Sequence, residues 1–422
     1  MNLAFVFHLY QPPTQKKSVL KQIVESCYIP LIKSIKNSKH LKATLDVPLS
    51  LTYQLEAAGY TDLLSSIKDL YENEKVELVS SAAYHPLLTK LPDSLVEREI
   101  VMDEFSMAHY FGKNKGFEGE EAMLIKDLNG FFPPELAVNL ELVKLINDLE
   151  YKWILVDEIA LPKDTNPLDV VHELPEMDLQ VVSRNRQVSN LISFKRDTNI
   201  DDILGSILSI KEKNKDLVIA LDGETFGHHY KEGIYLLETL VDALAKSGIN
   251  ILTVSELVER SVAKPLSTLI ESTWSSTRDD IDSGEPYPMW QHKSNQLQKV
   301  EWELHDAVAK SFSEKVPDFT SEALAELETL PVWNPVALEK ITDIPLKNHV
   351  YKNLLLLQCL SSDLFWWSSG ETIMGKKLFS PELITSSLEL YKNYAITTED
   401  DSLISRVNTL CADIDKEVSL IS

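Results

Sequence analysis

The sequence predicts an α/β protein in which a closed or nearly closed parallel β/α barrel is followed by a helical C-terminal domain. Two observations predict this fold. Through residues 1–265, short apolar runs of strand length alternate with segments whose apolar residues recur at helical spacing. Beyond this region only the helical spacing continues. Seven or eight βα units, joined by right-handed crossovers, are typical of a parallel barrel.

The expected strands are short and mostly apolar. The first is LAFVF at 3–7, and a helix pattern at 19–35 follows it. Further strands are expected at 42–47, 75–79, near Phe131, 153–156, 179–182, 217–221 and 250–254. Helical spacing fills the intervals, for example at 136–146 and 203–208. Because parallel neighbours need a long crossover connection, this alternation indicates a parallel sheet.

The character of the sequence changes after about residue 263. A polar segment with two tryptophans, residues 271–291, leads into helix patterns. These patterns lie at 297–309, 321–330, 346–360, 381–394 and 402–421. We therefore expect a barrel domain at 1–265 and a helical domain at 266–422. The helical domain should pack on the barrel, because its apolar faces need a partner that buries them.

Composition and net charge limit the kinds of molecule that the protein is expected to bind. Of the 422 residues 44% are apolar, and 65 acidic residues against 41 basic ones give a net charge of -24. Such a surface repels nucleic acids and anionic membranes but not a neutral, hydroxyl-rich substrate. The three scattered cysteines fit neither a disulfide framework nor a CxxC metal site. With no signal-like or membrane-length segment, we expect a soluble cytoplasmic protein without a cofactor or metal.

The chemistry is expected where the predicted strands end. The strand at 217–221 is apolar throughout and stops at Asp222, which places this acid at a C-terminal strand end. The turn that follows carries two glycines, a second acid and two histidines: Gly223, Gly227, Glu224, His228 and His229. A helix cap would explain one acid of this group but not the histidines.

Three other strand ends are also rich in polar side chains. They carry His8, Tyr10 and Gln11, then Glu77 with Tyr84 and His85, and finally Glu135 after two prolines. A barrel brings such ends together at one face. Glu135 could alternatively be an acidic first-turn residue that stabilises a helix. Burial is expected to raise the pKa of Asp222, as a proton donor paired with an ionised carboxylate requires.

In this order the segments resemble glycoside hydrolase family 57. The residues that carry the resemblance are His8-Leu9-Tyr10-Gln11-Pro12, Val76-Glu77-Leu78 with Tyr84-His85-Pro86-Leu87-Leu88, Gly130-Phe131-Phe132-Pro133-Pro134-Glu135, Ala220-Leu221-Asp222-Gly223-Glu224-Thr225-Phe226-Gly227-His228 and Leu252-Thr253-Val254-Ser255-Glu256. The resemblance implies a (β/α)7-type barrel followed by a helical domain. It also implies a retaining enzyme that acts on α-glucans or maltooligosaccharides.

By the same resemblance, the nucleophile is Glu135 and the general acid/base is Asp222. Substrate-binding roles are expected for His8, Tyr10, Gln11, Glu77, His85, Glu224 and His228. One position departs from the family pattern, because Tyr10 stands where family members commonly carry a histidine before Gln-Pro. A tyrosine can donate a hydrogen bond and stack on a sugar, but it is not protonated near neutral pH.

Three residues outside these motifs are further candidates for substrate binding. Trp274 and Trp290 could stack on glucose rings, or they could pin the long loop to the domain below. Arg184 follows a predicted strand and could hold substrate hydroxyls through its rigid fork, although solvated arginines are common in loops.

Two alternative functions remain open from the residues. One is a metal-dependent carbohydrate hydrolase or deacetylase on a related barrel, with zinc bound by His85, Asp222, His228 and His229. Another is a glucan-binding protein without catalysis. The sequence does not separate hydrolysis from transglycosylation or branching, because this depends on competition between water and a sugar acceptor. Preferred glucan length and oligomeric state stay open as well.

Overall fold

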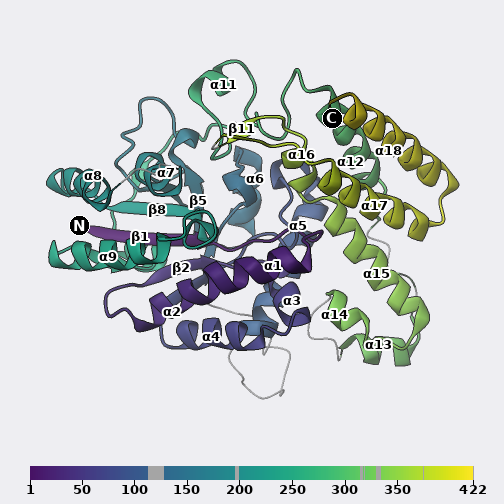
Figure 1. Ribbon diagram of the computed structural model, residues 1–422, viewed down its shortest axis with the longest axis horizontal. Helices are drawn as coiled ribbons and strands as arrows, with labels where there is room; N and C mark the ends of the chain where they lie inside the picture. Colours follow the sequence, from purple (N-terminus) through teal and green to yellow (C-terminus); the bar gives the residue numbers. More distant parts are fainter. Residues whose placement is uncertain are drawn as a thin grey trace.

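The barrel is present in the computed structural model, which describes residues 1–112, 128–194, 199–313, 317, 319–328, 334–373 and 375–421 (Figure 1). Every expected strand forms within a few residues of its predicted place. The strands are β1 Asn2–His8, β2 Ala43–Asp46, β3 Val76–Val79, β4 Gly130–Phe131, β5 Trp153–Asp157, β7 Gln180–Arg184, β8 Leu217–Asp222 and β9 Asn250–Leu252. The pattern missed β6 Val171–Glu173, which is only three residues long.

Seven of these strands form a parallel ring. One sheet has the order β3-β2-β1-β8 and the other contains β7-β5-β4, and all of these pairings are parallel. A parallel bridge between Ser80 and Phe131 joins β3 to β4. On the opposite side, the amide of Asn185 after β7 donates to the carbonyl of Val218 in β8 at 2.8 Å. The predicted (β/α)7-type barrel is thus confirmed within the described residues.

Side chains fill the interior of the ring. Small and branched residues from five strands pack there: Ala4, Val6, Val79, Leu155, Val182, Val218 and Ala220. Helix α10 (Val254–Arg260) contributes Val254 and Leu257 to the same cluster. Since α10 follows β9, which pairs with the first residues of β1, it closes the N-terminal end of the barrel. The C-terminal ends of the strands form the open face, which is where barrels carry their active sites.

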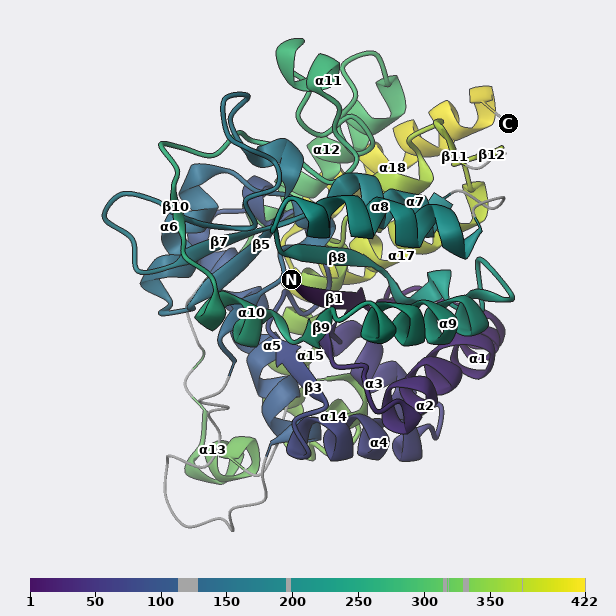
Figure 2. The same ribbon diagram turned by 90° about the vertical axis from the view of Figure 1, so that its left-hand side faces the viewer.

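Amphipathic helices surround the ring, and Figure 2 shows α7 and α8 on one side of β8 with α9 on the other. Their bounds are α1 Lys17–Ile23, α2 Ile29–Asn37, α3 Leu49–Ala57, α4 Thr61–Glu72, α5 Asp93–Phe111, α6 Leu140–Asp148, α7 Arg186–Phe194, α8 Ile200–Glu212 and α9 Gly233–Lys246. A π-helical turn, Val24–Tyr28, separates α1 from α2. The apolar faces of these helices bury the outer side of the strands.

The C-terminal part is helical, as expected. It contains α11 Arg278–Asp282, α12 Gln296–Ala309, α13 Ser321–Glu328, α14 Pro335–Leu338, α15 Ile344–Cys359, α16 Asp363–Trp367, α17 Pro381–Thr398 and α18 Asp401–Ile421. Positions 329 and 330 of the predicted helix 321–330 lie outside the described residues. Short β10 (Lys264–Pro265), β11 (Thr372–Ile373) and β12 (Lys376–Lys377) were not predicted, because two residues carry no period.

The helical part packs against helices α3 and α5 of the barrel domain. Its core residues from α12, α15, α17 and α18 form one cluster with Leu49 and Tyr53 of α3 and Leu95 of α5. This shared cluster agrees with the expectation that the helical faces need a partner, and the domain edge near residue 265 stays a prediction. Within the described residues, no helix is both long and apolar enough to cross a membrane.

Candidate active site

Glu135 lies at the C-terminal face of the barrel in a short 3-10 turn, Pro134–Leu136. Its backbone is left-handed, with φ 58° and ψ 14°, a conformation that costs a non-glycine residue energy and is often found at functional sites. The Trp274 indole Nε1 donates to Glu135 Oε2 at 2.8 Å, and the Trp274 amide donates to the Glu135 carbonyl at 3.1 Å. Two contacts from a distant loop therefore set the direction of this carboxylate.

The alternative role of Glu135 as a helix-stabilising residue does not fit this geometry. The following helix, α6, begins five residues later, and its cap is Asn139, whose side chain accepts from the Leu142 amide at 2.8 Å. Glu135 lies before this cap, outside the first turn of α6. Its carboxylate is thus free of a helix-capping duty.

Asp222 ends β8, opposite His8 of β1 in the strand register, and its side chain is partly exposed. Burial and the nearby charge of Asp222 raise the pKa of Glu135 to about 8, against lowering effects of His8 and the Trp274 hydrogen bond. The two acids therefore interact across the barrel mouth. The pKa of Glu135 is raised because its side chain, 13% exposed, is largely stripped of water.

His8 is the cationic centre of the group. Its Nδ1 lies 2.6 Å from Asp46 Oδ2. Burial alone would lower the pKa of His8, but the hydrogen bond and charge of Asp46, helped by Asp222 and Glu224, raise it to about 9. At neutral pH the imidazole is therefore protonated. Asp46, which ends β2 beside His8, was missed because a single acid after a strand is common in any α/β protein.

Aromatic rings line the site beside His8. The His8 ring is stacked on Phe132 at 4.9 Å and on His85 at 5.0 Å between centroids, and Tyr10 stacks on His85 at 4.1 Å. His85 has a left-handed φ of 61°, and its Nδ1 lies 3.8 Å from Glu135 Oε1. Burial and the charge of His8 lower the pKa of His85. One neutral and one cationic imidazole thus face the acids.

The helical part also reaches this site. The Tyr10 hydroxyl donates to Asp363 Oδ2 at 2.5 Å, and the Ser361 hydroxyl donates to the same oxygen. The His85 Nδ1 lies 3.2 Å from the Ser362 hydroxyl. Burial raises the pKa of Asp363 to about 6. Sequence analysis did not single out Asp363, although an acid at the start of an aromatic helix is a usable signal.

The Glu224 carboxylate accepts hydrogen bonds from two residues near the start of the chain, one after β1 and one in the π-helical turn. Gln11 Nε2 donates to Glu224 Oε1 at 2.8 Å, and the Tyr28 hydroxyl donates to the same oxygen. Burial and the charge of Asp222 raise the pKa of Glu224 to about 7. Tyr28 lies in the π-helical turn Val24–Tyr28, a feature that often accompanies functional sites and has no clear mark in sequence.

His228 lies partly buried in the same loop as Glu224. Its amide donates to the Glu224 carbonyl at 3.2 Å, and its ring is 5.3 Å from that of His229. Its role in substrate binding stays a prediction.

Arg184 is not placed to bind a substrate. Its Nε donates to Asp157 at 2.6 Å, one terminal nitrogen to the Ala220 carbonyl at 2.8 Å, and the other to Asn190 at 3.3 Å. The side chain is 4% exposed, and its guanidinium lies 5.4 Å from the Trp274 ring. The expectation of a substrate contact does not fit this position, because the side chain is almost fully covered and each of its three nitrogens already donates to a protein oxygen.

The two tryptophans of the long loop have different positions. Trp274 is partly buried and reaches Glu135. Trp290 is 0% exposed and packs 5.6 Å from Trp366, in a cluster with Tyr287. A sugar cannot stack on a ring that other side chains cover. The prediction of substrate binding is therefore wrong for Trp290, which pins the loop instead.

Glu77 also lies away from the acids. Its carboxylate accepts from Thr44 Oγ1 at 2.9 Å, from the Ser255 amide at 3.1 Å, and from the Ser255 hydroxyl. Ser255 belongs to the first turn of α10, at the closed end of the barrel. Substrate binding by Glu77 is therefore not supported, and the structure gives this acid a structural role. The neighbouring Thr253 and Glu256 form the capping box of α10.

A zinc site is not assembled either. The side chains considered for one were His85, Asp222, His228 and His229. Among the residues that the structure describes, no group of three or more histidine, cysteine, aspartate or glutamate side chains is arranged to hold a metal ion. Acids and a protonated imidazole, rather than metal ligands, make up the centre of the site.

Known proteins resemble this chain along most of its length. An alpha-amylase of Pyrococcus horikoshii is 22% identical over 374 residues, 85% of this chain and 53% of the relative, so the chain spans about half the length of that relative. The crystal structure of a GH57-type branching enzyme from Pyrococcus horikoshii has a TM-score of 0.66 at 14% identity, covering 99% of this chain and 95% of that one.

A second solved structure agrees. The 4-alpha-glucanotransferase of Thermococcus litoralis has a TM-score of 0.64 at 17% identity, covering 93% of this chain and 58% of that one. At these identities the similarities show a common fold. The sequence profile of Glycosyl hydrolase family 57 matches residues 5–269, which is more than half of the chain. On this match, the protein belongs to Glycosyl hydrolase family 57.

Proposed function

We propose that this protein is a retaining glycoside hydrolase or glucanotransferase that acts on α-glucans. Glu135 attacks the anomeric carbon while Asp222 protonates the leaving oxygen, and the glycosyl-enzyme then passes its sugar to water or to a sugar hydroxyl. The carrying observation is the position of Glu135: Trp274 directs its carboxylate at 2.8 Å, and Asp222 is close enough to raise its pKa.

The proposed roles require a particular placement of protons. Before substrate binds, the buried Glu135 holds a proton readily, since its pKa is about 8. The reaction needs this proton on Asp222 and the negative charge on Glu135. The protonated His8, which lowers the pKa of Glu135, and the Trp274 indole both favour that productive arrangement.

The lining supports a sugar as the substrate. Tyr10 and Trp274, both partly exposed, offer ring faces and polar edges beside His8 and His85, and such surfaces suit the apolar faces and hydroxyls of a glucose unit. The relatives named above act on α-glucans by their names, and we extend that substrate class to this chain. We further propose that residues 266–422 form a second wall of the site through Asp363.

Chemical rescue tests the nucleophile. Glu135→Ala should abolish turnover of every glycoside, and added azide should restore part of it with a glycosyl azide of inverted configuration as product, because the small anion occupies the vacated position. Asp222→Ala should spare the first step for nitrophenyl glycosides, whose leaving group departs without a proton. Inverted azide product from Asp222→Ala alone would exchange the two roles.

Product analysis separates hydrolysis from transfer. Purified protein would be incubated with maltooligosaccharides, amylose or glycogen, and the products separated by size. Shorter oligosaccharides alone would indicate hydrolysis, whereas longer or branched products would indicate transfer to a sugar acceptor. Tight glucan binding with no product from any of these substrates would favour the glucan-binding alternative over catalysis.

A further inference from the structure

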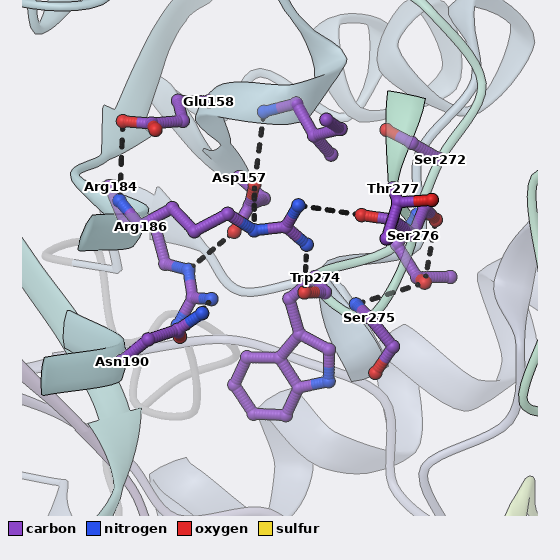
Figure 3. Close-up of polar contacts among 12 residues, drawn as sticks. Asp157, Glu158, Arg184, Arg186, Asn190, Ser272, Trp274, Ser275, Ser276 and Thr277 are labelled. Atoms are coloured by element: carbon purple, nitrogen blue, oxygen red, sulfur yellow. Dashed lines mark hydrogen bonds and ion pairs between the residues drawn. The ribbon is translucent and has the colours of Figure 1, made fainter. Parts of the chain in front are cut away.

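A buried charge cluster of Asp157, Arg184 and Arg186 lies beside Trp274 (Figure 3). Asp157 ends β5 and is fully buried. It accepts from Arg184 Nε at 2.6 Å and pairs with Arg186 Nε at 3.3 Å. A buried acid is stabilised only if its partners hold it well, and two arginines from the end of β7 and the start of α7 do so here. Asp157 therefore fixes where both guanidinium groups lie.

Arg186 uses its other nitrogens on the backbone of the segment that follows the barrel. One terminal nitrogen donates to the Ser276 carbonyl at 2.6 Å, and the other donates to the Trp274 carbonyl. In Figure 3 the guanidinium of Arg186 lies between Asp157 and this segment. A planar fork can satisfy an acid and two carbonyls at once, which a lysine ammonium on a flexible stem does poorly.

The segment 272–277 has few other anchors near Trp274. Ser272 exchanges backbone hydrogen bonds with Val138 at 3.0 and 3.1 Å, and the Ser276 hydroxyl donates to the Pro286 carbonyl at 2.7 Å. Between these two points, Trp274 turns its indole to Glu135. The position of this donor depends on the Trp274 amide, which donates to the Glu135 carbonyl at 3.1 Å, and on Arg186, which holds the carbonyls of Trp274 and Ser276.

We propose that Arg186, oriented by Asp157, is a positioning residue that holds the segment 272–277 so that the Trp274 indole donates to Glu135. The inference rests on the proposed function of Glu135 as the nucleophile. Arg186 contacts neither the reacting atoms nor either catalytic acid in this arrangement. Its effect passes through Trp274, whose hydrogen bond favours the ionised form of Glu135 that attacks the sugar.

Other charges around Arg186 define the controls. Glu158 Oε2 accepts from the Arg186 amide at 3.2 Å, and Arg184 and Arg278 also act on Arg186 electrostatically. Arg278 is the matched control, because it donates to the Leu161 carbonyl at 2.8 Å and lies in α11, next to the same segment. Arg278→Met removes an arginine-to-carbonyl hydrogen bond without touching the Trp274 backbone.

A double-mutant cycle tests the inference. Trp274→Phe, which keeps a ring but removes the donor, should lower kcat/KM for a nitrophenyl α-glucoside or maltooligosaccharide by about 10- to 100-fold. Arg186→Met should lower it by a similar factor, and Arg186→Lys by less. The Arg186→Met, Trp274→Phe double variant should match Trp274→Phe within about twofold, because both changes remove the same contact. Arg278→Met should stay near the wild-type value.

The pH profile of kcat/KM distinguishes loss of the indole hydrogen bond from general loosening of the segment 272–277. Loosening alone would not change the pH at which activity falls. Loss of the indole donor should shift the acid limb of kcat/KM to higher pH, equally in Trp274→Phe and Arg186→Met, because the ionised form of Glu135 is less favoured. Should Arg186→Met melt near the assay temperature, Arg186→Lys carries the same cycle. The positioning role would be overturned if the fold-losses of the two single variants multiplied in the double variant. It would also be overturned if the acid limb of the pH profile shifted in Trp274→Phe but not in Arg186→Met.

The failure of the proposed function would look different. If Glu135→Ala kept activity, Glu135 would not be the nucleophile, whatever the cycle gave. If Glu135→Ala were inactive and rescued by azide while Arg186→Met behaved as Arg278→Met does, the nucleophile would stand and only the role of Arg186 would be wrong.

Discussion

Two partly buried glutamates at opposite ends of the barrel, Glu135 and Glu77, have opposite surroundings. Burial raises the pKa of both. Glu77 accepts three hydrogen bonds, from Thr44 and from the amide and hydroxyl of Ser255. Glu135 has the Trp274 indole as its hydrogen-bond donor and a second acid, Asp222, in its field. A buried acid that neighbours satisfy ties the fold together, whereas one that neighbours leave poised is available for chemistry.

The largest effect should come from Glu135→Gln. We expect kcat to fall roughly 10⁴-fold, because the amide cannot form the glycosyl-enzyme. The melting temperature should stay level or rise, since the amide removes the cost of ionising a poorly solvated carboxyl group beside Asp222. Steady-state kinetics and thermal unfolding of the same preparation check both parts. A variant that is strongly destabilised but still active would place Glu135 with Glu77 as a structural acid.

The reverse pattern should hold for Glu77→Ala. Three donors at the base of the barrel would lose their acceptor, and we expect the free energy of unfolding to fall by about 3 kcal/mol. Urea unfolding measures this change. The activity of the folded fraction should remain within a few-fold of wild type, because Glu77 lies at the closed end of the barrel. A loss of kcat as large as that of Glu135→Gln, in well-folded protein, would return Glu77 to the substrate site.

The Asp46→Asn variant should remove the positive charge of His8 at the barrel mouth. Burial lowers the pKa of His8, and only its acidic neighbours raise it to about 9. Without the Asp46 charge the imidazole should be largely neutral at pH 7. The pKa of Glu135 should then rise, because a positive neighbour is lost, and kcat/KM at pH 7 should fall about tenfold.

The titration of the His8 ring by NMR provides the direct measurement for this variant. In the wild type it should titrate near pH 9, and in Asp46→Asn well below that. Asp306→Asn is the matched control, because Asp306 pairs with His305 at 3.5 Å in helix α12 of the helical part. An unchanged His8 titration in Asp46→Asn would show that Asp46 does not maintain the cation.

The smallest effect is expected at Tyr10. Tyr10→Phe keeps the ring that stacks on His85 but removes the hydroxyl that donates to Asp363 at 2.5 Å. Asp363 retains the Ser361 hydroxyl. We expect KM for maltooligosaccharides to rise about threefold to tenfold with kcat within twofold, as loss of uniform binding predicts. A large fall in kcat would mean that the contact between Tyr10 and Asp363 of the helical part contributes to the chemical step.

Local pattern predicted most of the scaffold. Strands of four or more residues are mostly apolar, as in 217–221, and were found at their places. The two-residue strands were missed, except β4, which lies beside the FFPPE motif. Glu135 and Asp222 were singled out because each lies at or just after a strand end and stands in a distinctive motif, and their catalytic roles stay proposals. Four residues that hold the surrounding side chains, Asp46, Asp363, Tyr28 and Asp157, were missed, and of these only Asp363 carries a local signal.

Local patterns are enough to predict the alternation of strands and helices, the helical C-terminal part and the acids near the C-terminal strand ends. These features depend on spacing and residue type within a few neighbours. The folded chain alone brings Trp274 to Glu135 across 139 positions and Tyr10 to Asp363 across 353. It also decided that Glu77, Arg184 and Trp290 are internal. A side chain's pKa, partners and exposure depend on what folds against it, and no local pattern encodes that.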